Sequence, residues 1–386
     1  MPTLIINAGS SSLRFALFSK NLEVQYEGHI DAINQKHCHY RRKLKNGKEE
    51  TQRVKARNHE EALRIAISKL LEDKAIEKLS EIKKVGHRVG HGGEHFTKPT
   101  RVNKKILKTL SELNELAPLH NPANLAALKA SSKWLPRSEQ FAVFDTGFHS
   151  TLPQRAFLYG LPFKLYKKEG IRRFGFHGIS HEYVSKEALK KLKKKSARLI
   201  TCHLGNGVSL AAIKDGKSLD TSMGFTPLEG PLMGTRSGTI DPALIFHLVN
   251  KKRTLADVKH LLEKESGFKG MSEIGSDIRQ LWARPRSEGT LRTFDLFSYQ
   301  IAKIIGSYMV PLGGAPDAVV FTAGVGENAF YLREQICAYF KAFGLELDHA
   351  KNRNNEELIS KKSSKIKVLV IKTHEELEIA RKIQKL

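Results

Sequence analysis

Two apolar runs separated by a small polar turn open the chain. The runs Leu4–Asn7 and Leu13–Phe18 are rich in Ile, Leu and Phe, and Ala-Gly-Ser-Ser-Ser joins them. This pattern predicts a β-hairpin, and the run Leu22–Ile30 is expected to add a third strand. Gly9 allows backbone torsions that other residues resist, and the serine N–H and hydroxyl groups can cradle an anion such as phosphate. On this stretch alone, a plain tight turn is the more frequent interpretation.

Strand-like and helix-like segments then alternate, which argues for an α/β architecture. Residues 31–58 are polar and weakly periodic, as in an extended ribbon or loops. Strands are expected at Val85–Gly93, Phe141–Phe144, Ala318–Thr322 and Lys365–Ile371. Helices are expected at His59–Ile76, Asn103–Leu116, Pro122–Leu135, Asp241–Asn250, Leu255–Glu265, Thr293–Val310 and Thr373–Gln384. In the last helix, Thr373 is expected to be the N-cap, with Glu376 completing a capping box.

The opening pattern occurs a second time. Arg198–Cys202 and Val208–Ile213 are strand-like runs around a glycine turn, and Asp215-Gly216 leads to a third run at Lys217–Thr221. The segments LIINAGSSSLRFALF and LITCHLGNGVSLAAI therefore share one layout. An internal duplication of a three-strand meander predicts two similar domains with a cleft between them, where ligands commonly bind.

Composition narrows the class of protein. With 386 residues, 40% hydrophobic and 27% charged, the chain is typical of a globular protein of two or three domains. It has no apolar run long enough for a membrane span and no signal-peptide pattern, so no membrane partner is expected. Cys38, Cys202 and Cys337 lie far apart in no metal-ligand spacing, which is typical of reduced thiols in a cytoplasmic protein.

The net charge of +25 is unusual for an enzyme. It suggests either binding to nucleic acid or many lysines on solvated helix faces. The densest basic block, Lys186–Lys195, contains no aromatic residue, and the chain has no zinc-finger or RNA-binding signature. Solvated lysines are therefore the favoured interpretation.

Four glycine turns follow strand-like runs, at Gly9, Gly92-Gly93, Gly205–Gly207 and Gly324–Gly326. In a duplicated α/β chain, they point to one site built from loops at strand ends. None of them fits the P-loop or the protein-kinase glycine loop, and AGVGEN fits a dinucleotide fingerprint only weakly.

Histidine and arginine residues lie close to these turns. His87, His91 and His95 have helical spacing, but intervening glycines break any helix, and zinc binding is disfavoured. His177 lies between glycines just after two arginines, which suits an anion site.

Three further charged residues lie in turns or at a strand end. Arg88 and Arg236 lie in glycine-rich turns, where a guanidinium is either solvated or binds a carboxylate or phosphoryl group. Asp145 ends a strand-like run and could act on substrate or metal, or simply cap a turn.

Taken together, the motifs resemble the acetate kinase family of the acetate and sugar kinase/Hsp70/actin superfamily. The matching segments are INAGSSSLRFALF, GHRVGHGG, APLHNP, FDTGFH, RRFGFHGISH, HLGNGVSLAAI, DTSMGFTPLEGPLMGTRSGTIDP, FTAGVGENAFYLR and THEELEIAR. The resemblance implies two duplicated ribonuclease H-like (actin-like ATPase) domains with a cleft between them. Residues 1–147 with the C-terminal helix 373–386 would form the first domain. Residues 148–372 would form the second, with the nucleotide site and a homodimer interface.

The resemblance also implies an activity, namely reversible direct phosphoryl transfer from ATP to acetate, giving ADP and acetyl phosphate. The cofactor would be Mg²⁺, with Mn²⁺ as an alternative, bound by Asn7 and Glu375. The implied catalytic residues are Asp145, His177 and Arg236. Those implied to bind the short-chain carboxylate are Arg88, Gly90, Leu119, His120, Phe176 and Pro227. Those implied to bind ATP are Ser10, Ser12, Arg14, His203, Leu204, Gly205, Asn206, Gly207, Asp277, Ile278, Arg279, Gly324, Val325, Gly326, Glu327 and Asn328.

The chain departs from the family pattern at three positions. Arg14 replaces the usual lysine, which exchanges a compact ammonium for a wide guanidinium. His374 replaces an asparagine next to the retained Glu375. Gly90 replaces a valine of the methyl pocket, so we expect a larger acyl site that accepts propionate or butyrate, at a cost to acetate of about 1–3 kcal/mol.

Three alternatives remain. A propionate or butyrate kinase would share the fold and mechanism. A sugar kinase of the superfamily would use Asp145 as a base and would not need Arg88. A basic nucleic-acid-binding protein that retained only the fold is disfavoured by the joint presence of the catalytic residues.

Overall fold

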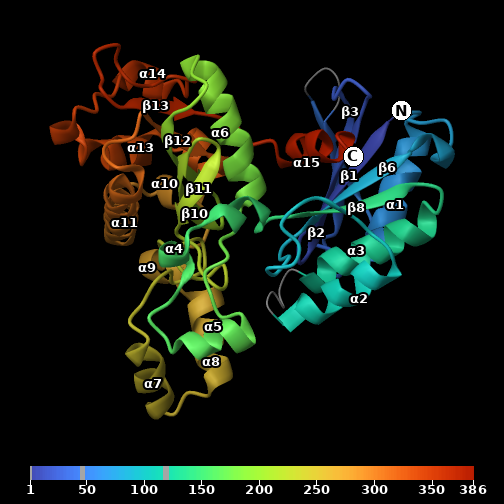
Figure 1. Ribbon diagram of the computed structural model, residues 1–386, viewed down its shortest axis with the longest axis horizontal. Coiled ribbons are helices and arrows are strands. Elements are labelled where there is room, and N and C mark those ends of the chain that lie inside the picture. Colours follow the sequence, from blue (N-terminus) through green and yellow to red (C-terminus); the bar gives the residue numbers. More distant parts are fainter. Residues whose placement is uncertain (1, 44–47, 116–120) are drawn as a thin grey trace. The chain divides into compact units, whose positions relative to one another are not determined.

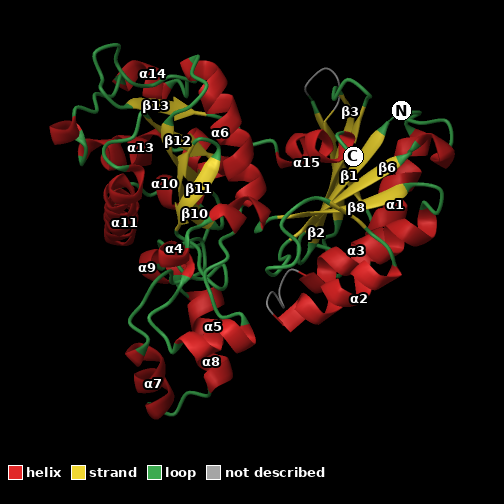
Figure 2. Cartoon of the chain, in the orientation of Figure 1, coloured by secondary structure: helices red, strands yellow, loops and turns green. Residues whose placement is uncertain are grey.

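The computed structural model describes residues 2–43, 48–115 and 121–386. The chain forms two compact units (Figures 1 and 2). Unit 1 contains residues 1–147 and 374–386, and unit 2 contains residues 148–373. The predicted residues Leu119 and His120 lie outside the described part of the chain.

Unit 1 is built on a mixed sheet. In the described residues its strand order is β5-β4-β3-β2-β1-β6-β8-β7. β1, β6 and β8 are parallel neighbours, whereas β2 to β5 continue the sheet as an antiparallel meander. The elements are β1 (Thr3–Ala8), β2 (Ser12–Phe18), β3 (Val24–Asp31), β4 (His39–Lys43), β5 (Glu49–Arg53), α1 (His59–Glu72), β6 (Lys84–Val89), β7 (Thr100–Arg101), α2 (Lys104–Glu112), α3 (Asn121–Trp134), β8 (Glu139–Phe144) and α15 (Glu375–Gln384).

Alternation along β1 divides the apolar side chains of unit 1 between two faces. Leu4 and Ile6 join the core formed with α1 and α3. Ile5 points to the other face, which α15 covers (Figure 1). A Cβ on Gly86 would come within 2.9 Å of Ile5, Ile379 and Ile383, so this glycine lets α15 approach the sheet closely.

Unit 2 repeats the same plan. Its strand order in the described residues is β11-β10-β9-β12-β13, with β9, β12 and β13 parallel. α11 packs on one face of this sheet and α6 on the other. The elements are α4 (Gln154–Phe157), α5 (Phe163–Glu169), α6 (Gly178–Leu192), β9 (Arg198–Leu204), β10 (Val208–Lys214), β11 (Lys217–Thr221), α7 (Ala243–Asn250), α8 (Leu255–His260), α9 (Gly267–Ser272), α10 (Ile278–Trp282), α11 (Glu288–Leu312), β12 (Ala318–Thr322), α12 (Ala323–Asn328), α13 (Phe330–Ala338), α14 (His349–Arg353) and β13 (Lys367–Val370).

The predicted duplication is confirmed strand by strand. The order β3-β2-β1-β6-β8 in unit 1 matches β11-β10-β9-β12-β13 in unit 2. In chain order, each sheet begins with a three-strand antiparallel meander and adds parallel strands beside the first strand of that meander. The Asp215-Gly216 turn has φ angles of 53° and 71°, as a two-residue hairpin loop requires.

Several local predictions were wrong, each for a physical reason. α1 ends at Glu72 rather than at residue 76, because Lys74 takes a left-handed φ of 54°. The fourth predicted glycine turn, Gly324–Gly326, is not a turn but part of the helix α12. Gly9 does not use the positive φ that it allows; a Cβ there would lie 2.7 Å from Ser12 Oγ.

The helix boundaries near the chain's C-terminal half also differ. α11 begins at Glu288, because Ser287 caps it by accepting a hydrogen bond from the Thr290 N–H. The segment expected as one helix over 255–265 is α8 followed by a π-helical turn at Leu261–Glu265. The predicted capping box at Thr373 is absent, since His374 is the N-cap of α15 and makes no side-chain capping bond.

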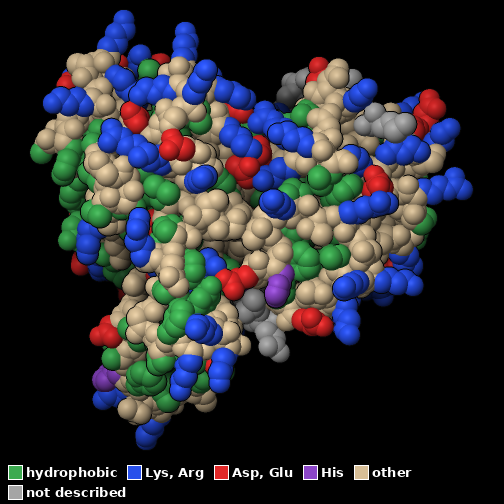
Figure 3. All heavy atoms as spheres, viewed as in Figure 1, with side chains coloured by type: hydrophobic (Ala, Val, Ile, Leu, Met, Phe, Trp, Pro, Cys, Tyr) green, Lys and Arg blue, Asp and Glu red, His purple; other side chains and the backbone are tan. Residues whose placement is uncertain are grey.

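The basic surplus is distributed widely. Lys and Arg side chains are spread over the visible surface of both units and outnumber Asp and Glu there (Figure 3). Among the described residues, no helix is long and apolar enough to cross a membrane.

Candidate functional site

Three polar side chains of unit 1 lie where neighbouring parallel strands end. Asn7 is near the end of β1, Arg88 is near the end of β6, and Asp145 directly follows β8. β6 lies between β1 and β8 in the sheet, so the three residues share one sheet edge. The carboxyl edge of parallel strands is where ligands of α/β proteins usually bind.

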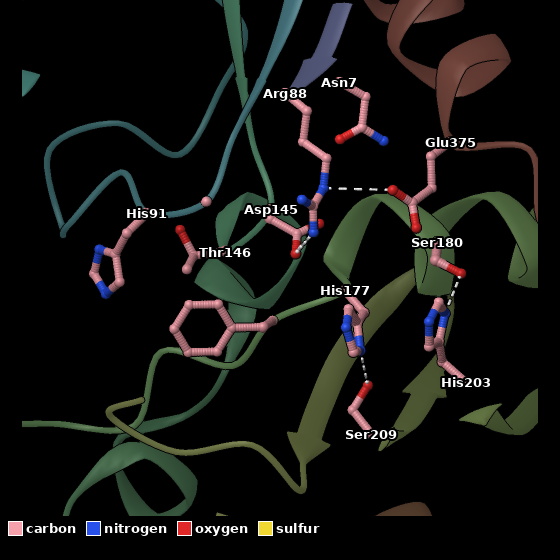
Figure 4. Close-up of polar contacts among 12 residues, drawn as sticks. Asn7, Arg88, His91, Asp145, Thr146, His177, Ser180, His203, Ser209 and Glu375 are labelled. Carbon is pink, nitrogen blue, oxygen red and sulfur yellow. Dashed lines mark hydrogen bonds and ion pairs between the residues drawn. The ribbon is translucent and has the colours of Figure 1, made fainter. Parts of the chain in front are cut away.

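Arg88 forms the centre of this group (Figure 4). Its Nη2 donates to Asp145 Oδ2 at 2.8 Å, and its Nε lies 3.4 Å from Glu375 Oε2 at the start of α15. Asp145 is almost completely buried. Burial by itself would lower the pKa of Arg88, but the carboxylates of Asp145 and Glu375 outweigh it and raise that pKa. The guanidinium is therefore a permanent cation at this edge.

Three carboxyl groups, those of Asp145, Glu375 and Glu376, lie close together at this sheet edge. Burial raises the pKa of Glu375 to about 7, Arg88 opposes this rise, and the nearby Asp145 and Glu376 add to it. Asn7 Nδ2 donates to Glu376 Oε1 at 3.2 Å. Amide and carboxylate oxygens are the ligands that Mg²⁺ prefers, and a divalent cation would reduce the repulsion among these carboxylates. In the described residues, however, no group of three or more His, Cys, Asp or Glu side chains could hold a metal by itself.

The candidate nucleotide segments of unit 2 also lie on one sheet edge. β9 and β12 are parallel neighbours, and Thr322 pairs with His203. The turn Gly205–Gly207 and the helix α12 therefore start side by side. The turn is closed by a hydrogen bond from the Gly205 N–H to the Gly207 carbonyl at 3.0 Å.

His177 and Arg236 converge on this turn. A Cβ added to Gly207 would lie 3.1 Å from His177 Cε1, 3.3 Å from His177 Nε2 and 3.6 Å from Arg236 Nη1. A side chain here would press on the His177 ring, which would have to shift by a few tenths of an ångström. His177 is the N-cap of α6 and has a left-handed φ of 56°, which turns its ring out of the helix.

Arg236 is a cation held without a carboxylate partner among the described residues. Its Nη1 donates to the Pro227 carbonyl at 3.2 Å and lies 3.8 Å from Met233 Sδ. Burial lowers its pKa, and Glu263 partly opposes that effect. A partly buried guanidinium with so little counter-charge favours an anionic ligand.

The residues implied for acyl binding are divided between the units. Gly90 is buried in unit 1, and its N–H donates to Asn124 Oδ1 at 2.8 Å. Phe176, 3% exposed, and Pro227 belong to unit 2.

The remaining ATP candidates lie in three places. Ser10 and Ser12 belong to the β1–β2 turn, and Arg14 is exposed on β2 opposite Asn7. Asp277 is the N-cap of α10 and accepts hydrogen bonds from Arg279 Nε at 3.0 Å. In α12, burial raises the pKa of Glu327, whose carboxylate accepts from the Thr373 N–H at 3.2 Å.

Two histidines of the GHRVGHGG segment have partners inside unit 1. His87 Nε2 lies 2.9 Å from Gln140 Oε1, and His91 Nδ1 accepts from the Gly93 N–H at 2.9 Å. Burial lowers the pKa of both rings to about 4.

The sequence reasoning missed the residues behind His177. Ser209 Oγ lies 2.9 Å from His177 Nδ1, and Ser180 Oγ lies 2.8 Å from His203 Nδ1 (Figure 4). A serine inside the apolar run of β10 was the available signal, since a buried hydroxyl requires a partner. Glu376 was also missed as a partner of Asn7, because it had been assigned to a capping box.

Comparisons with known proteins agree over nearly the whole chain. The model of the Acetokinase family matches residues 2–381. Acetate kinase of Thermotoga petrophila is 45% identical, covering 99% of this chain and 97% of that protein. Acetate kinase of Acetivibrio thermocellus is 43% identical, with coverage of 100% and 99%.

Two solved structures are similar at the level of the fold and the sequence. Porphyromonas gingivalis acetate kinase superposes with a TM-score of 0.91 at 37% identity, covering 98% of each chain. A propionate kinase from Francisella tularensis superposes with a TM-score of 0.92 at 37% identity, covering 99% of this chain and 98% of that one.

Proposed function

Because the chain belongs to the acetokinase family, we propose that it transfers the γ-phosphoryl group of ATP to the carboxylate of acetate, forming acetyl phosphate and ADP. The reaction is a reversible phosphotransfer with a carboxyl group as acceptor. Convergence of Arg236 and His177 on Gly207 is the observation that carries this proposal, because it concentrates positive charge and hydrogen-bond donors beside a turn suited to phosphate.

The acceptor needs no general base. An aliphatic carboxylic acid has a pKa of about 4–5, so acetate is already ionised at pH 7. Arg88 contacts Asp145 through Nη2 and Glu375 through Nε, which leaves Nη1 to donate to the acetate carboxylate. Asp145 holds the guanidinium in this orientation. Rate enhancement then comes from alignment and charge stabilisation rather than from proton transfer.

Arg236 and His177 would stabilise the charge on the phosphoryl group during transfer. The guanidinium of Arg236 supplies a planar set of N–H donors, and Nε2 of His177 lies on the same side of Gly207. Mg²⁺, or Mn²⁺ in its place, would be held by Asn7 and Glu375 together with water, and when bound it neutralises phosphate charge.

The nucleotide would bind along the glycine segments of unit 2. His203 to Gly207 would hold the phosphates through turn N–H groups. Asp277 to Arg279 and Gly324 to Asn328 would contact the adenosine. Arg14 of unit 1 would contribute a cation to the phosphates.

Propionate or butyrate is the second candidate acceptor. Gly90 favours it, since the valine usual at this position in the family would narrow the acyl site. The similarity to a propionate kinase at 37% identity is compatible with this alternative.

The proposed assembly is a homodimer formed through unit 2. In support, α7 has no buried residue, and Leu244 and Phe246 on it are 46% and 70% exposed. Cys38, Cys202 and Cys337 are buried free thiols, which supports a reducing compartment such as the cytoplasm. We propose no nucleic-acid partner, since the basic side chains are dispersed over the visible surface (Figure 3).

An ATP-dependent hydroxamate assay tests the proposal, because hydroxylamine traps the acyl phosphate. Wild-type protein is expected to form hydroxamate from acetate, and Arg88→Ala to lose at least about 100-fold in kcat/KM for acetate, since a charge-assisted contact is removed. Arg101→Ala is the matched control, because Arg101 is an exposed arginine of unit 1 paired with Glu139. Full acetate turnover by Arg88→Ala would refute the carboxylate assignment.

A further inference from the structure

A buried histidine of unit 2 has no part in the mechanism above. His181 lies in α6, one helical turn after His177, and its side chain is completely buried. Ser209 of β10 and Thr201 of β9 are equally buried. Polar groups in such a place require partners, and here each finds one among the others.

The four side chains form a continuous line of short contacts. His177 Nδ1 lies 2.9 Å from Ser209 Oγ, which in turn lies 2.7 Å from His181 Nε2. At the other side of the ring, His181 Nδ1 lies 2.7 Å from Thr201 Oγ1. The line therefore begins at the ring of His177 on the side away from Gly207 and Arg236.

Counting protons restricts what this line can do. Each hydroxyl carries one proton, so Ser209 can donate to only one of its two histidine nitrogens and must accept from the other. His181 carries one ring proton, because its complete burial disfavours the imidazolium. These conditions leave two directions of donation along the line, one toward His177 and one away from it.

In the first arrangement every donor points toward His177. Thr201 donates to His181 Nδ1, His181 Nε2–H donates to Ser209, and Ser209 donates to Nδ1 of His177. A neutral His177 then carries its proton on Nε2, the nitrogen beside Gly207 and Arg236. That nitrogen is a donor toward the place proposed for the phosphoryl group.

In the second arrangement every donor points away from His177. Nδ1–H of His177 donates to Ser209, Ser209 donates to His181 Nε2, and His181 Nδ1–H donates to Thr201. His177 is then either neutral with its proton on Nδ1, which leaves Nε2 an acceptor, or an imidazolium that has taken one proton from solvent and keeps Nε2–H. His181 stays neutral and only exchanges the nitrogen that carries its proton.

We propose that Ser209, His181 and Thr201 are positioning residues that form a hydrogen-bond relay behind His177, so that protonation of its Nδ1 is coupled to the direction of donation along the line. The inference rests on the proposed role of His177 in phosphoryl transfer. The relay itself is a property of unit 2 and can be measured without turnover.

Other titratable groups also face these rings. The ring of His203, on β9, stacks on His177 with centroids 4.1 Å apart and lies 6.3 Å from His181. Arg236 is the cation near His177, and His149 meets His181 edge-on at 5.7 Å. Ser209 is the hydroxyl that pairs with Nδ1 of His177.

NMR titration of histidine-labelled protein tests the relay, with the His177 signal identified by its loss in His177→Gln. In Thr201→Val the isosteric side chain can neither donate to nor accept from His181. The direction toward His177 then leaves only a lone pair of His181 unpaired, whereas the direction away leaves a buried N–H unpaired, so protonation of His177 Nδ1 is disfavoured. The titration midpoint of His177 is then expected to move to lower pH by about one unit, a tenfold change in proton affinity from the loss of one hydrogen bond. Ser209→Ala is expected to shift it at least as far.

Ser218→Ala is the matched control, because it removes another buried serine–histidine hydrogen bond, 2.8 Å from His149 Nδ1. We expect it to leave both the His177 midpoint and kcat unchanged. In kinase assays, Ser209→Ala and Thr201→Val are expected to lower kcat about tenfold while the KM values for ATP and acetate change less than about threefold.

An unchanged His177 midpoint in Thr201→Val, or an equal shift in Ser218→Ala, would overturn the relay. If the midpoints shift as expected and wild-type protein does not phosphorylate any short-chain acid, the relay stands and the proposed function fails.

Discussion

The backbone of Gly90 is held in place by a hydrogen bond, and its lack of a side chain is proposed to enlarge the acyl site. Its N–H is held by Asn124, so adding a side chain changes bulk at a defined position. We expect the wild-type protein to use propionate and butyrate with kcat/KM close to that for acetate. Gly90→Val is expected to lower the propionate-to-acetate ratio of kcat/KM by about tenfold, the usual value of one or two methyl groups in an apolar pocket.

The control for this variant is Gly160→Val, since nothing lies within 4 Å of a Cβ at Gly160. That substitution should leave the acyl-chain ratio unchanged. A strong preference for acetate in the wild-type protein would contradict the larger pocket.

For single residues, the sequence predicts which charged side chains lie at strand ends better than it predicts which residues they contact. Arg88 and Asp145 could be selected because each lies in or next to a turn after a strand-like run. The partner of Arg88 in α15 and the serine behind His177 could not be found from turn patterns, because those contacts join distant parts of the chain. Thr373 was misassigned for the same reason, since its hydroxyl bonds Ser180 at 2.8 Å.

The β9–β10 turn is the element on which the phosphate proposal depends. Gly207→Ala would place a Cβ 3.1 Å from His177 Cε1, closer than side chains normally pack, so the ring must move. Misplacing a catalytic group by about 1 Å can cost up to about 100-fold in rate, and this shift is a few tenths of an ångström, so we expect kcat to fall by about 3–10-fold. The thermal midpoint of unfolding should change little.

The matched control is Gly160→Ala, which adds the same methyl group where nothing lies within 4 Å. Retention of wild-type kcat by Gly207→Ala would show that the ring beside this turn is not needed for transfer.

The sequence pattern predicted strands better than it predicted the ends of helices. The strands of both meanders follow directly from short apolar runs between turn residues. Helix ends were less predictable, because they depend on single residues such as Lys74 in a left-handed conformation or Ser287 as a cap. The two glycines of AGVGEN predict a turn after β12, but this segment is the helix α12.

Buried neutral histidines make the stability of the whole molecule dependent on pH. The pKa values of His87 and His91 are about 4 in the folded protein, against an ordinary value of 6.5. Between these values the unfolded chain binds more protons than the folded one, so stability is lost as pH falls from about 7 toward 4. For His87 alone the loss amounts to about 3 kcal/mol by pH 4.

Urea unfolding at a series of pH values from 7 to 4.5 measures this loss. His260→Gln is the control, because His260 is exposed and its replacement should leave the slope unchanged. A free energy of unfolding that stays constant or rises toward pH 4.5 would contradict the prediction.

For the whole chain, the duplication was the most predictable property, because the same order of apolar runs and turns occurs twice in the sequence. That residues 374–386 belong to unit 1 was expected only through the family resemblance, since no local pattern in α15 identifies its partner strands.

The return of α15 to unit 1 has a consequence for biosynthesis. A ribosome makes β1, β6 and β8 first and must translate all of unit 2 before it reaches α15. Until then the apolar surface around Ile5 and Gly86 lacks its cover, and Arg88 lacks Glu375. The first unit to emerge is thus the last to be completed, and a chain truncated before residue 374 lacks Glu375, a residue proposed to hold Mg²⁺.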